Sequence, residues 1–494
     1  MPIDSQAAAA IAPPPHPIEG RMLIGGELVQ GRGGQWLDSV NPADESPLGR
    51  VPHADAGDVD AAVAAALKAQ PAWAALPVAE RAACLHRFGD GIIARADELL
   101  AIEVADTGNP VTPMRADIHG SVERMRHLIG LGYEPQGRTI PATPNNLHLT
   151  LREPYGVVGR IIAFNHPIAM AVNGIAGPLI VGNTAVLKPS EQCPLSAVVL
   201  AEIARQTLPP GVLNIVFGGA AAGEALVRHP KVKRLSFVGS VRTGMAIQRA
   251  AAEAAVKAFS LELGGKNPFI VFPDAPVDKV AAAAVAGMNF TWQGQSCSST
   301  SRLFLHESIH DAVLDRIVAG VNGIRIGSPF EWATQMGAIN SRAHLQRIEG
   351  HIRAGLEDGA RLVAGGKRPA GDAFRKGWWL QPTVFADVRQ DMRIAREEIF
   401  GPVLSVLRWS EVDEVLEMAN AVEYGLSGAV WTQDITQALN TARRLQSGYV
   451  WVNGVNTHAR AVPFGGYKNS GIGRERALDE LYSYTEEKSV QIML

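Results

Sequence analysis

The sequence predicts an α/β protein with two doubly wound parallel sheets, and two observations lead to this fold class. First, short apolar runs alternate with helical stretches from residue 156 onward. Second, these runs carry few charged side chains, which is typical of parallel strands buried on both faces of a sheet. Because a second alternating series begins near Asn267, two α/β units of comparable size are expected.

The first series consists of apolar, β-branched runs separated by stretches with helical spacing. The segment 161–187 contains no Asp, Glu, Lys or Arg, but Asn, Gly and Pro interrupt it. A membrane-spanning helix needs about 20 apolar residues, so this segment is interpreted as buried strand, turn, helix and strand. The expected strands are 157–164, 184–187, 213–217 and 235–238, and the expected helices are 195–205, 223–229 and 242–257, with a further helix after Pro167.

The second series continues the alternation to residue 453, and the Ala-rich stretches 59–75 and 79–105 are expected to be helical. The segment 489–494 alternates weakly and predicts a strand with no local partner. An unpaired strand edge tends to associate, so this strand is expected to join another sheet, for example in a second subunit. The expected strands are 268–272, 302–305, 403–408, 426–431 and 449–453, and the expected helices are 277–292, 411–421 and 435–445.

Composition excludes several classes of protein. Lys and Arg number 46 against 49 Asp and Glu, which argues against a nucleic-acid or anionic-membrane partner. Three cysteines at unrelated spacings exclude a disulfide framework and a Cys-rich zinc module, and no metal site is expected. Residues 1–20 hold an alanine run and a proline cluster without the basic start of a secretory signal, so they are expected to be a disordered tail. A cytoplasmic enzyme is the simplest interpretation.

Two strand-to-helix junctions are candidates for phosphate binding. Neither a Gly-x-Gly-x-x-Gly motif after the first strand nor a Walker loop is present. Gly218, Gly219 and Gly223 follow an expected strand and precede a helix, where free N–H groups can bind phosphate. The junction 237–244 contains Gly239 and Ser240 at a second helix start. From these residues alone, a tight turn and an ordinary Ser cap explain the two junctions equally well.

One cysteine differs from the other two. Cys84 lies on an expected helix face and Cys193 just before a helix, and both are interpreted as packing residues. Cys297 lies in the small, polar stretch 293–302, where the sulfur is approachable and backbone amides can converge on an oxyanion. The thiolate is the reactive form of cysteine, so a nucleophilic role requires a base or polarising groups from elsewhere in the chain.

Seven segments together resemble the NAD(P)-dependent aldehyde dehydrogenase superfamily, in the order and at about the spacing of that family. The likeness extends from about residue 21 to the end of the chain. A single motif could arise by chance, whereas seven in order are specific. The segments are 164–167 (FNHP), 187–191 (LKPSE), 237–240 (FVGS), 261–266 (LELGGK), 294–297 (GQSC), 397–402 (EEIFGP) and 463–468 (PFGGYK).

The resemblance implies catalytic roles for four residues. Cys297 matches the nucleophile, which attacks the aldehyde to give a thiohemiacetal and, after hydride transfer to the nicotinamide, a thioester. The side-chain amide of Asn165 and the backbone N–H of Cys297 match the oxyanion donors. Glu262 matches the general base that activates water for hydrolysis. Glu475 matches a carboxylate implicated in proton relay in some members, although a structural salt bridge explains it equally well.

The resemblance also implies a cofactor site and a substrate site. NAD is the expected cofactor and NADP is possible, because a carboxylate such as Glu191 accepts hydrogen bonds from ribose hydroxyls but repels a 2′-phosphate. Apolar side chains are candidates for a substrate tunnel, and no Arg or Lys cluster is recognisable, so a neutral or apolar aldehyde is expected. The implied cofactor residues are Phe164, Lys188, Glu191, Gly218, Gly239, Ser240, Glu398 and Phe400, and the candidate substrate residues are Met170, Trp292, Trp451 and Phe464.

The family fold adds a small β extension for oligomerisation, so a homodimer or homotetramer is expected. The implied domains are a dinucleotide-binding domain (21–130 and 153–263), a catalytic domain (264–465) and the oligomerisation extension (131–152 and 480–494). Two alternatives to a hydrolytic aldehyde dehydrogenase stay open. A CoA-acylating dehydrogenase typically lacks the base at Glu262, and a binding protein that merely keeps the fold has no need of Cys297, Glu262 and Asn165 together.

Overall fold

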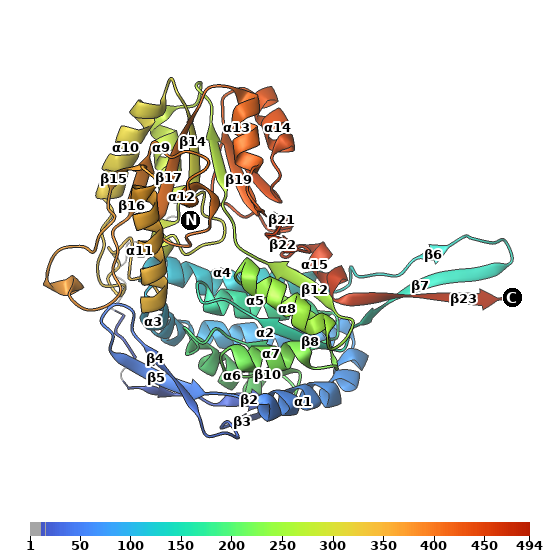
Figure 1. The fold of residues 1–494 in the computed structure, drawn as a ribbon. Helices are drawn as coiled ribbons and strands as arrows, with labels where there is room; N and C mark the ends of the chain where they lie inside the picture. The colour runs from blue at the N-terminus through green and yellow to red at the C-terminus, as the bar shows by residue number, and fades with distance from the viewer. Residues whose placement is uncertain (1–10, 15) are drawn as a thin grey trace.

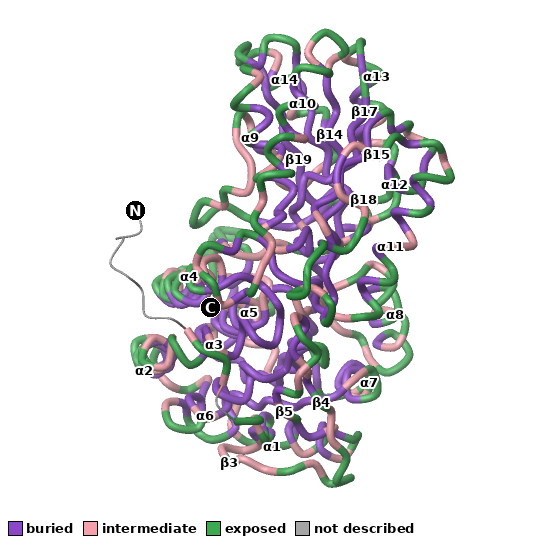
Figure 2. The backbone as a smooth tube through the Cα atoms, turned by 90° about the vertical axis from the view of Figure 1, so that its left-hand side faces the viewer, coloured by how far each residue is buried: buried purple, intermediate pink, exposed green. Residues whose placement is uncertain are grey.

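A computed structural model describes residues 11–14 and 16–494 and places two large sheets in two lobes, from which a β arm projects (Figure 1). The predicted fold class is confirmed, because each lobe contains a mainly parallel sheet with helices around it. The buried residues run through the centre of both lobes (Figure 2). Among the described residues, no helix combines the length and the apolarity that a membrane crossing requires.

An eight-stranded sheet forms the core of one lobe, with the order β22-β12-β11-β8-β9-β10-β2-β3. The five strands from β12 to β10 are parallel, and β8 and β9 are buried throughout, as expected for a sheet covered on both faces. The strands are β2 (Met22–Ile24), β3 (Glu27–Val29), β8 (Val157–Ile161), β9 (Thr184–Lys188), β10 (Leu213–Ile215), β11 (Val232–Val238), β12 (Ala258–Glu262) and β22 (Gly471–Ile472).

Eight helices surround this sheet. The expected helical stretch 79–105 is divided at Arg95, which lies between α2 and α3 outside helical geometry. The charge-free segment 161–187 forms the end of β8, helix α5 and most of β9, as predicted. The helices are α1 (Ala56–Ala75), α2 (Val78–Ala94), α3 (Ala96–Thr107), α4 (Val111–Gly130), α5 (Pro167–Ile180), α6 (Ser196–Thr207), α7 (Ala220–Arg228) and α8 (Val241–Ala252).

A seven-stranded sheet forms the core of the second lobe, with the order β15-β16-β17-β14-β13-β19-β20. All of its neighbouring strands are parallel except β15 and β16. Its elements are β13 (Pro268–Val271), α9 (Val277–Gly287), η1 (Phe290–Trp292), β14 (Arg302–His306), α10 (His310–Asn322), α11 (Arg342–Glu357), β15 (Arg361–Ala364), η2 (Asp372–Phe374), β16 (Thr383–Ala386), α12 (Arg393–Arg396), β17 (Val403–Trp409), α13 (Val412–Asn420), β19 (Ser427–Trp431), α14 (Ile435–Arg444) and β20 (Tyr449–Val452).

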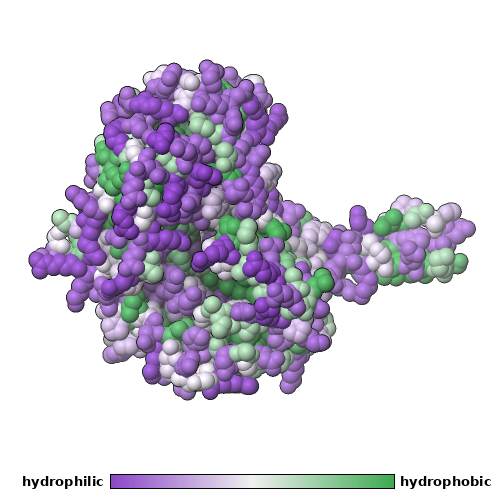
Figure 3. Space-filling model, in the orientation of Figure 1, coloured by the Kyte–Doolittle hydropathy of each residue, from purple (hydrophilic) through white to green (hydrophobic). Residues whose placement is uncertain are grey.

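The projecting arm corrects the prediction for the C-terminal strand. Strand β23 (Thr485–Met493) pairs antiparallel with β7 (Asn146–Pro154) of the same chain, and β6 (Thr139–Ile140) pairs with the other edge of β7. The partner was missed because it lies more than 300 residues away in the sequence. Figure 3 shows apolar side chains on this arm, where Leu147, Leu151 and Met493 are exposed.

The remaining strands are short. The predicted tail of residues 1–20 ends earlier than expected, because β1 (Ile18–Glu19) pairs with β5 (Pro47–Pro52). Residues 1–10 and 15 of that prediction lie outside the described residues. The other elements are β4 (Trp36–Val40), β18 (Tyr424–Gly425), β21 (Tyr467–Lys468) and α15 (Leu478–Ser483).

Candidate active site

Two cavities meet between the lobes. The first has a volume of about 650 Å³ and lies along β8, β9 and β11 and the starts of α7 and α8. The second has a volume of about 440 Å³ and lies between α4, α5 and the segment 456–480. Cys297, Glu262, Met170 and Val238 line both cavities. A group bound in either cavity can therefore reach the same thiol and carboxyl.

Cys297 lies on the loop between η1 and β14. The side-chain amide of Asn267 donates to the carbonyl oxygens of Cys297 and Ser299, at 2.8 and 2.9 Å, and so fixes the backbone that follows the thiol. The residue is half-buried, whereas Cys84 and Cys193 are buried. Burial and the nearby Glu262 carboxyl raise the pKa of the Cys297 thiol, which favours its protonated form.

Glu262 is the last residue of β12, and its carboxyl lies within hydrogen-bonding reach of the Cys297 thiol. Among the described residues, its Oε1 atom has no hydrogen-bond partner although the residue is buried. Burial raises the pKa of Glu262 to about 8, and the negative charge of Glu475 contributes to this rise. A carboxyl with a pKa near neutrality can exchange protons at physiological pH, as a general base must.

Asn165 stands beside these groups at the start of α5. It is 3% exposed and lines the first cavity. Neither atom of its side-chain amide has a hydrogen-bond partner among the described residues. Buried amides are normally satisfied, so an unpaired N–H in this position is suited to an oxyanion that forms only during reaction.

Glu475 lies in the wall of the second cavity and forms an ion pair with Arg160 of β8, at 2.8 Å. Burial opposes its ionisation, but the Arg160 guanidinium lowers its pKa overall. Its backbone bonds reciprocally with Phe464, at 2.8 and 3.0 Å. Glu475 thus forms the salt bridge that the sequence analysis considered. Its carboxylate also lies close enough to Glu262 to raise the pKa of Glu262, and its part in proton relay stays a prediction.

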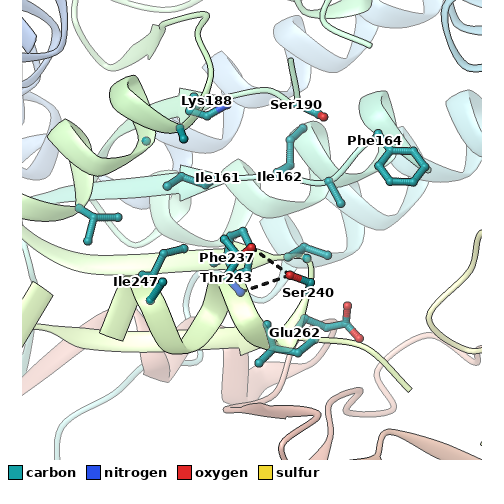
Figure 4. A pocket seen from close by; sticks show the side chains of 18 of the residues that line it. Ile161, Ile162, Phe164, Lys188, Ser190, Phe237, Ser240, Thr243, Ile247 and Glu262 are labelled. Atoms are coloured by element: carbon teal, nitrogen blue, oxygen red, sulfur yellow. Dashed lines mark hydrogen bonds between the residues drawn. The ribbon is translucent and has the colours of Figure 1, made fainter. Parts of the chain in front are cut away.

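Lys188, at the end of β9, has its side chain at one end of the first cavity (Figure 4). Its ammonium donates to the carbonyl oxygen of Gly218 at 2.6 Å and to Glu191 at 3.3 Å. The Glu191 carboxylate is half-exposed and lines the cavity. Gly218 does not line the cavity but holds the turn before α7, while the adjacent Gly219 does line it.

The second phosphate-binding candidate also lies on the first cavity. Ser240 caps α8 by accepting from the Thr243 N–H at 3.2 Å, and Figure 4 shows it in the cavity wall. A Cβ atom on Gly239 would lie 2.4 Å from the Phe237 ring, so only glycine fits there. The helix cap and the phosphate site proposed from the sequence are compatible, because the cap leaves other N–H groups of the first turn free.

Glu398 and Phe400 reach the first cavity from the second lobe. Glu398 accepts from the Gly265 N–H at 2.8 Å, and burial raises its pKa to about 7. The Phe400 ring meets the edge of Phe164 at 5.7 Å between centroids. Phe400 has a φ of +54°, and its carbonyl oxygen lies 2.6 Å from Nε2 of His344, a residue that the sequence analysis missed.

Three of the four candidate substrate residues line the second cavity. These are Met170, Trp292 and Phe464. The centroids of the Trp292 and His166 rings lie 4.3 Å apart. Nδ1 of His166 lies 2.8 Å from Oδ2 of Asp117. Trp451 corrects the prediction, because it lines neither cavity. It is buried, and its indole N–H donates to the Thr457 carbonyl at 2.7 Å, so it supports the loop behind the cavity.

Four arginines line the second cavity, and the sequence analysis did not recognise them as a group; one of them is Arg160 of β8. Arg124 comes from α4, whereas Arg460 and Arg476 come from the segment that follows β20. More than 330 residues separate Arg124 from Arg460 along the chain. No local motif connects them, and only the packing of α4 against the C-terminal segment brings them together.

Comparison with known proteins agrees with this fold and site. The family model described as "Aldehyde dehydrogenase family" matches residues 28–490. The chain therefore belongs to the aldehyde dehydrogenase family, whose members are oxidoreductases, and the resemblance found in the sequence is confirmed.

Individual relatives are similar over almost the whole chain. The aldehyde dehydrogenase tropH of Talaromyces stipitatus is 46% identical over 464 residues, which are 92% of this chain and 90% of that protein. The NAD+ complex of a Bacillus cereus aldehyde dehydrogenase is 40% identical, with a TM-score of 0.93 and 97% of both chains covered. An indole-3-acetaldehyde dehydrogenase of P. syringae, in complex with NAD+ and IAA, is 37% identical, with a TM-score of 0.94 and 97% and 98% covered.

Proposed function

We propose that the protein is an NAD-dependent aldehyde dehydrogenase that oxidises an aldehyde to a carboxylic acid through a covalent adduct on Cys297. The observation that carries this proposal is that Cys297 and Glu262 line both cavities. A nucleophile and a base at such a junction can act on a substrate in one cavity beside a cofactor in the other.

The first cavity fits a dinucleotide. Its lining offers the start of α8 for the pyrophosphate, the Glu191 carboxylate for a ribose and the Glu398 carboxyl with Phe400 at the opposite end. Two of the named relatives, from Bacillus cereus and P. syringae, were solved with NAD+. When bound, NAD supplies the hydride acceptor for the oxidation.

The residues at the junction have complementary roles in forming the adduct. Glu262 accepts the proton of the Cys297 thiol, and the sulfur then bonds to the aldehyde carbon to give a thiohemiacetal. The amide of Asn165 and the backbone N–H of Cys297 donate to the developing oxyanion. A preorganised donor of this kind typically contributes about 3–4 kcal/mol to transition-state stabilisation. Loss of hydride from the adduct leaves a thioester on Cys297.

Hydrolysis of the thioester needs a base, and Glu262 is proposed to fill this role a second time. Glu262 first releases to solvent the proton that it took from Cys297. Its carboxylate then removes a proton from water as the oxygen of that water adds to the thioester carbon. The carbon–sulfur bond breaks, the carboxylic acid leaves, and the proton held by Glu262 passes to the Cys297 sulfur. General-base catalysis contributes on the order of 10²- to 10⁴-fold to such a step. This use of Glu262 also argues against transfer of the acyl group to CoA.

We propose NAD rather than NADP as the preferred cofactor, because the half-exposed Glu191 carboxylate would repel a 2′-phosphate. The adjacent Lys188 ammonium is largely committed to Gly218 and Pro189, so its positive charge offers a 2′-phosphate little compensation. NADP use therefore stays possible at a lower efficiency.

This function is tested by assaying a panel of aldehydes with NAD and with NADP in parallel. Formation of the reduced cofactor is the readout. Oxidation that needs no CoA and yields free carboxylic acid supports it. Product formation only with CoA would favour the acylating alternative. The absence of any aldehyde-dependent reduction, across short and long aldehydes, would favour a binding protein.

Three further proposals concern organisation. The arm of β6, β7 and β23, with its exposed apolar side chains, is proposed as the oligomerisation extension of a homodimer or homotetramer, which light scattering tests. The domain boundaries expected from the sequence are kept as proposed, with β22 added to the dinucleotide-binding sheet.

The cytoplasmic location and the neutral or apolar character of the aldehyde stay predictions, and the second of these is taken up below.

A further inference from the structure

The wall of the second cavity carries more positive charge than the chain itself neutralises. Arg160 is paired with Glu475 at 2.8 Å, and Arg460 is paired with Glu123. Arg124 reaches only Asp117, at the longer distance of 3.8 Å, and Asp117 already holds His166.

Two further carboxyls in this wall, Glu262 and Glu480, do not supply the missing negative charge. Burial raises the pKa of each to about 8, so both are largely protonated at neutral pH. In the cavity wall, four arginines thus face three carboxylates that form ion pairs with them, and one guanidinium is left without such a partner.

Arg476 is the cation without a counter-charge. Among the described residues, no carboxylate oxygen lies within 4.0 Å of its guanidinium, although it lines the cavity. Its guanidinium lies over the Phe464 ring, 4.3 Å from the ring centroid. Its backbone has a φ of +72°, and its N–H donates to Glu480 at 2.6 Å. A side chain held at both ends in this way loses little freedom when it binds a ligand.

Arg124 adds a second positive charge to the cavity wall that is only weakly neutralised. Burial lowers the pKa of Arg124, and the positive charges of Arg476 and Arg460 lower it further, as expected for guanidiniums that line one cavity. Like charges gathered around a cavity attract and concentrate ions of opposite charge there. Guanidinium groups are also well matched to carboxylates, which they bind through paired N–H donors.

We propose that Arg476, with Arg124 beside it, binds an anionic group on the aldehyde, so that the enzyme prefers aldehydes that carry a carboxylate over neutral aldehydes of the same length. This inference rests on the proposed function, since it concerns the substrate of the same site. It also replaces the sequence-based expectation of a neutral or apolar aldehyde. The apolar residues Met170, Trp292 and Phe464 would contact the chain between the aldehyde and the carboxylate.

The experiment compares matched substrates. A short and a long ω-oxo carboxylate are each tested against the corresponding primary amide, which has the same shape without the charge, and kcat/KM is measured with NAD. A hydrogen bond to a charged group in a partly enclosed site predicts a preference of about 10- to 100-fold for the carboxylate at the better-fitting length. Added salt should weaken oxidation of the carboxylate more than that of the amide.

Substitutions locate the effect. R476Q should bring the ratio of carboxylate to amide close to one, and R476K should retain part of the preference. The matched control is R375Q, since Arg375 is exposed and far from the cavity wall; its ratio should equal that of the unmodified enzyme. Burial raises the pKa of the Cys297 thiol and the charge of Arg476 opposes this rise, so R476Q is expected to slow oxidation of both substrates. A change of the thiol acts equally on acid and amide and leaves the ratio unchanged.

A binding measurement covers the case in which R476Q is too slow to assay. A dicarboxylate should slow alkylation of Cys297 by iodoacetamide in the unmodified protein, whereas the corresponding diamide should not, and R476Q should lose this protection. The other two cysteines are buried, so the reaction reports on Cys297.

The possible results separate this inference from the proposed function. Equal or better oxidation of the amides by the unmodified enzyme would overturn the inference and leave the aldehyde dehydrogenase function intact. An unchanged preference in R476Q would likewise overturn it. Failure to oxidise any aldehyde would overturn both.

Discussion

The Arg160 guanidinium donates a hydrogen bond to the Glu475 carboxylate at 2.8 Å, and both residues line the second cavity together with Glu262. The pair keeps Glu475 ionised despite its burial. The retained negative charge then raises the pKa of Glu262. Burial is the main cause of the raised pKa of Glu262, and an ion pair between β8 and the C-terminal segment thus adds to the proton affinity of the residue proposed as the general base.

The first prediction follows from this relationship. Replacing Glu475 with Gln removes a negative charge near Glu262, so the pKa of Glu262 should fall and thioester hydrolysis should reach its half-maximal rate at a lower pH. The measurement is the pH profile of deacylation in the purified variant and in the unmodified enzyme. A midpoint that stays in place or moves upward would contradict the electrostatic coupling.

The second prediction concerns the pH dependence of the unmodified enzyme. The base form of Glu262 is the ionised form, and the pKa of this residue is raised to about 8. The ionised fraction grows as the pH rises through this value, so the rate of deacylation should increase from pH 7 to pH 9 and then level off. Single-turnover decay of the thioester measures this step directly. A rate independent of pH over that range would count against Glu262 as the base.

The third prediction tests the nucleophile. Cys297→Ala should abolish aldehyde oxidation, because no other thiol lines either cavity in the described residues. Binding of NAD should be retained, since the cofactor residues are untouched, and calorimetric titration measures this. Cys84→Ala, on α2, serves as the control and should keep its activity. Normal turnover by Cys297→Ala would refute the proposed mechanism.

The fourth prediction separates the two halves of the reaction. Glu262→Gln keeps the shape of the side chain but cannot act as a base, so it should slow deacylation by about 10²- to 10⁴-fold and hydride transfer much less. Rapid mixing should then show a full burst of NADH followed by slow turnover. Steady-state rates equal to those of the unmodified enzyme would show that another group activates the water.

The fifth prediction concerns cofactor choice. Glu191→Gln removes the carboxylate proposed to repel a 2′-phosphate and leaves Lys188 without its ion-pair partner. The KM for NADP should fall while the KM for NAD rises. The ratio of kcat/KM for the two cofactors, measured with one aldehyde, checks this expectation. A ratio that does not change would place the discrimination elsewhere in the cavity.

Much of the fold could be predicted because its signals are local. The alternation of apolar runs and helical stretches placed β8, β9, β13 and β19 close to their observed bounds, since a parallel strand buried on both faces must be almost free of charge. The C-terminal strand was recognised but not its partner. Strand pairing joins segments distant in the sequence, and a periodic pattern contains no information about which edge a strand will join.

The residues of the candidate site likewise fall into those that could be predicted from the sequence and those that could not. Residues within short motifs, such as Cys297 and Glu262, could be assigned by resemblance. Trp451 was wrongly predicted to line the substrate cavity. The residue type alone does not distinguish an aromatic side chain in a cavity wall from one that is buried behind that wall. His344 was missed because its contact with the Phe400 carbonyl joins α11 to a loop more than 50 residues away.

The sequence by itself determined the fold class and the family and supplied the candidates for the reactive groups, because each depends on residue types at short, fixed spacings. Only the tertiary structure decided the environment of those groups. The raised pKa of Glu262, the unpaired amide of Asn165 and the four arginines around the second cavity depend on distances between side chains from different elements. Burial and Coulomb interactions are functions of these distances, which no linear pattern contains.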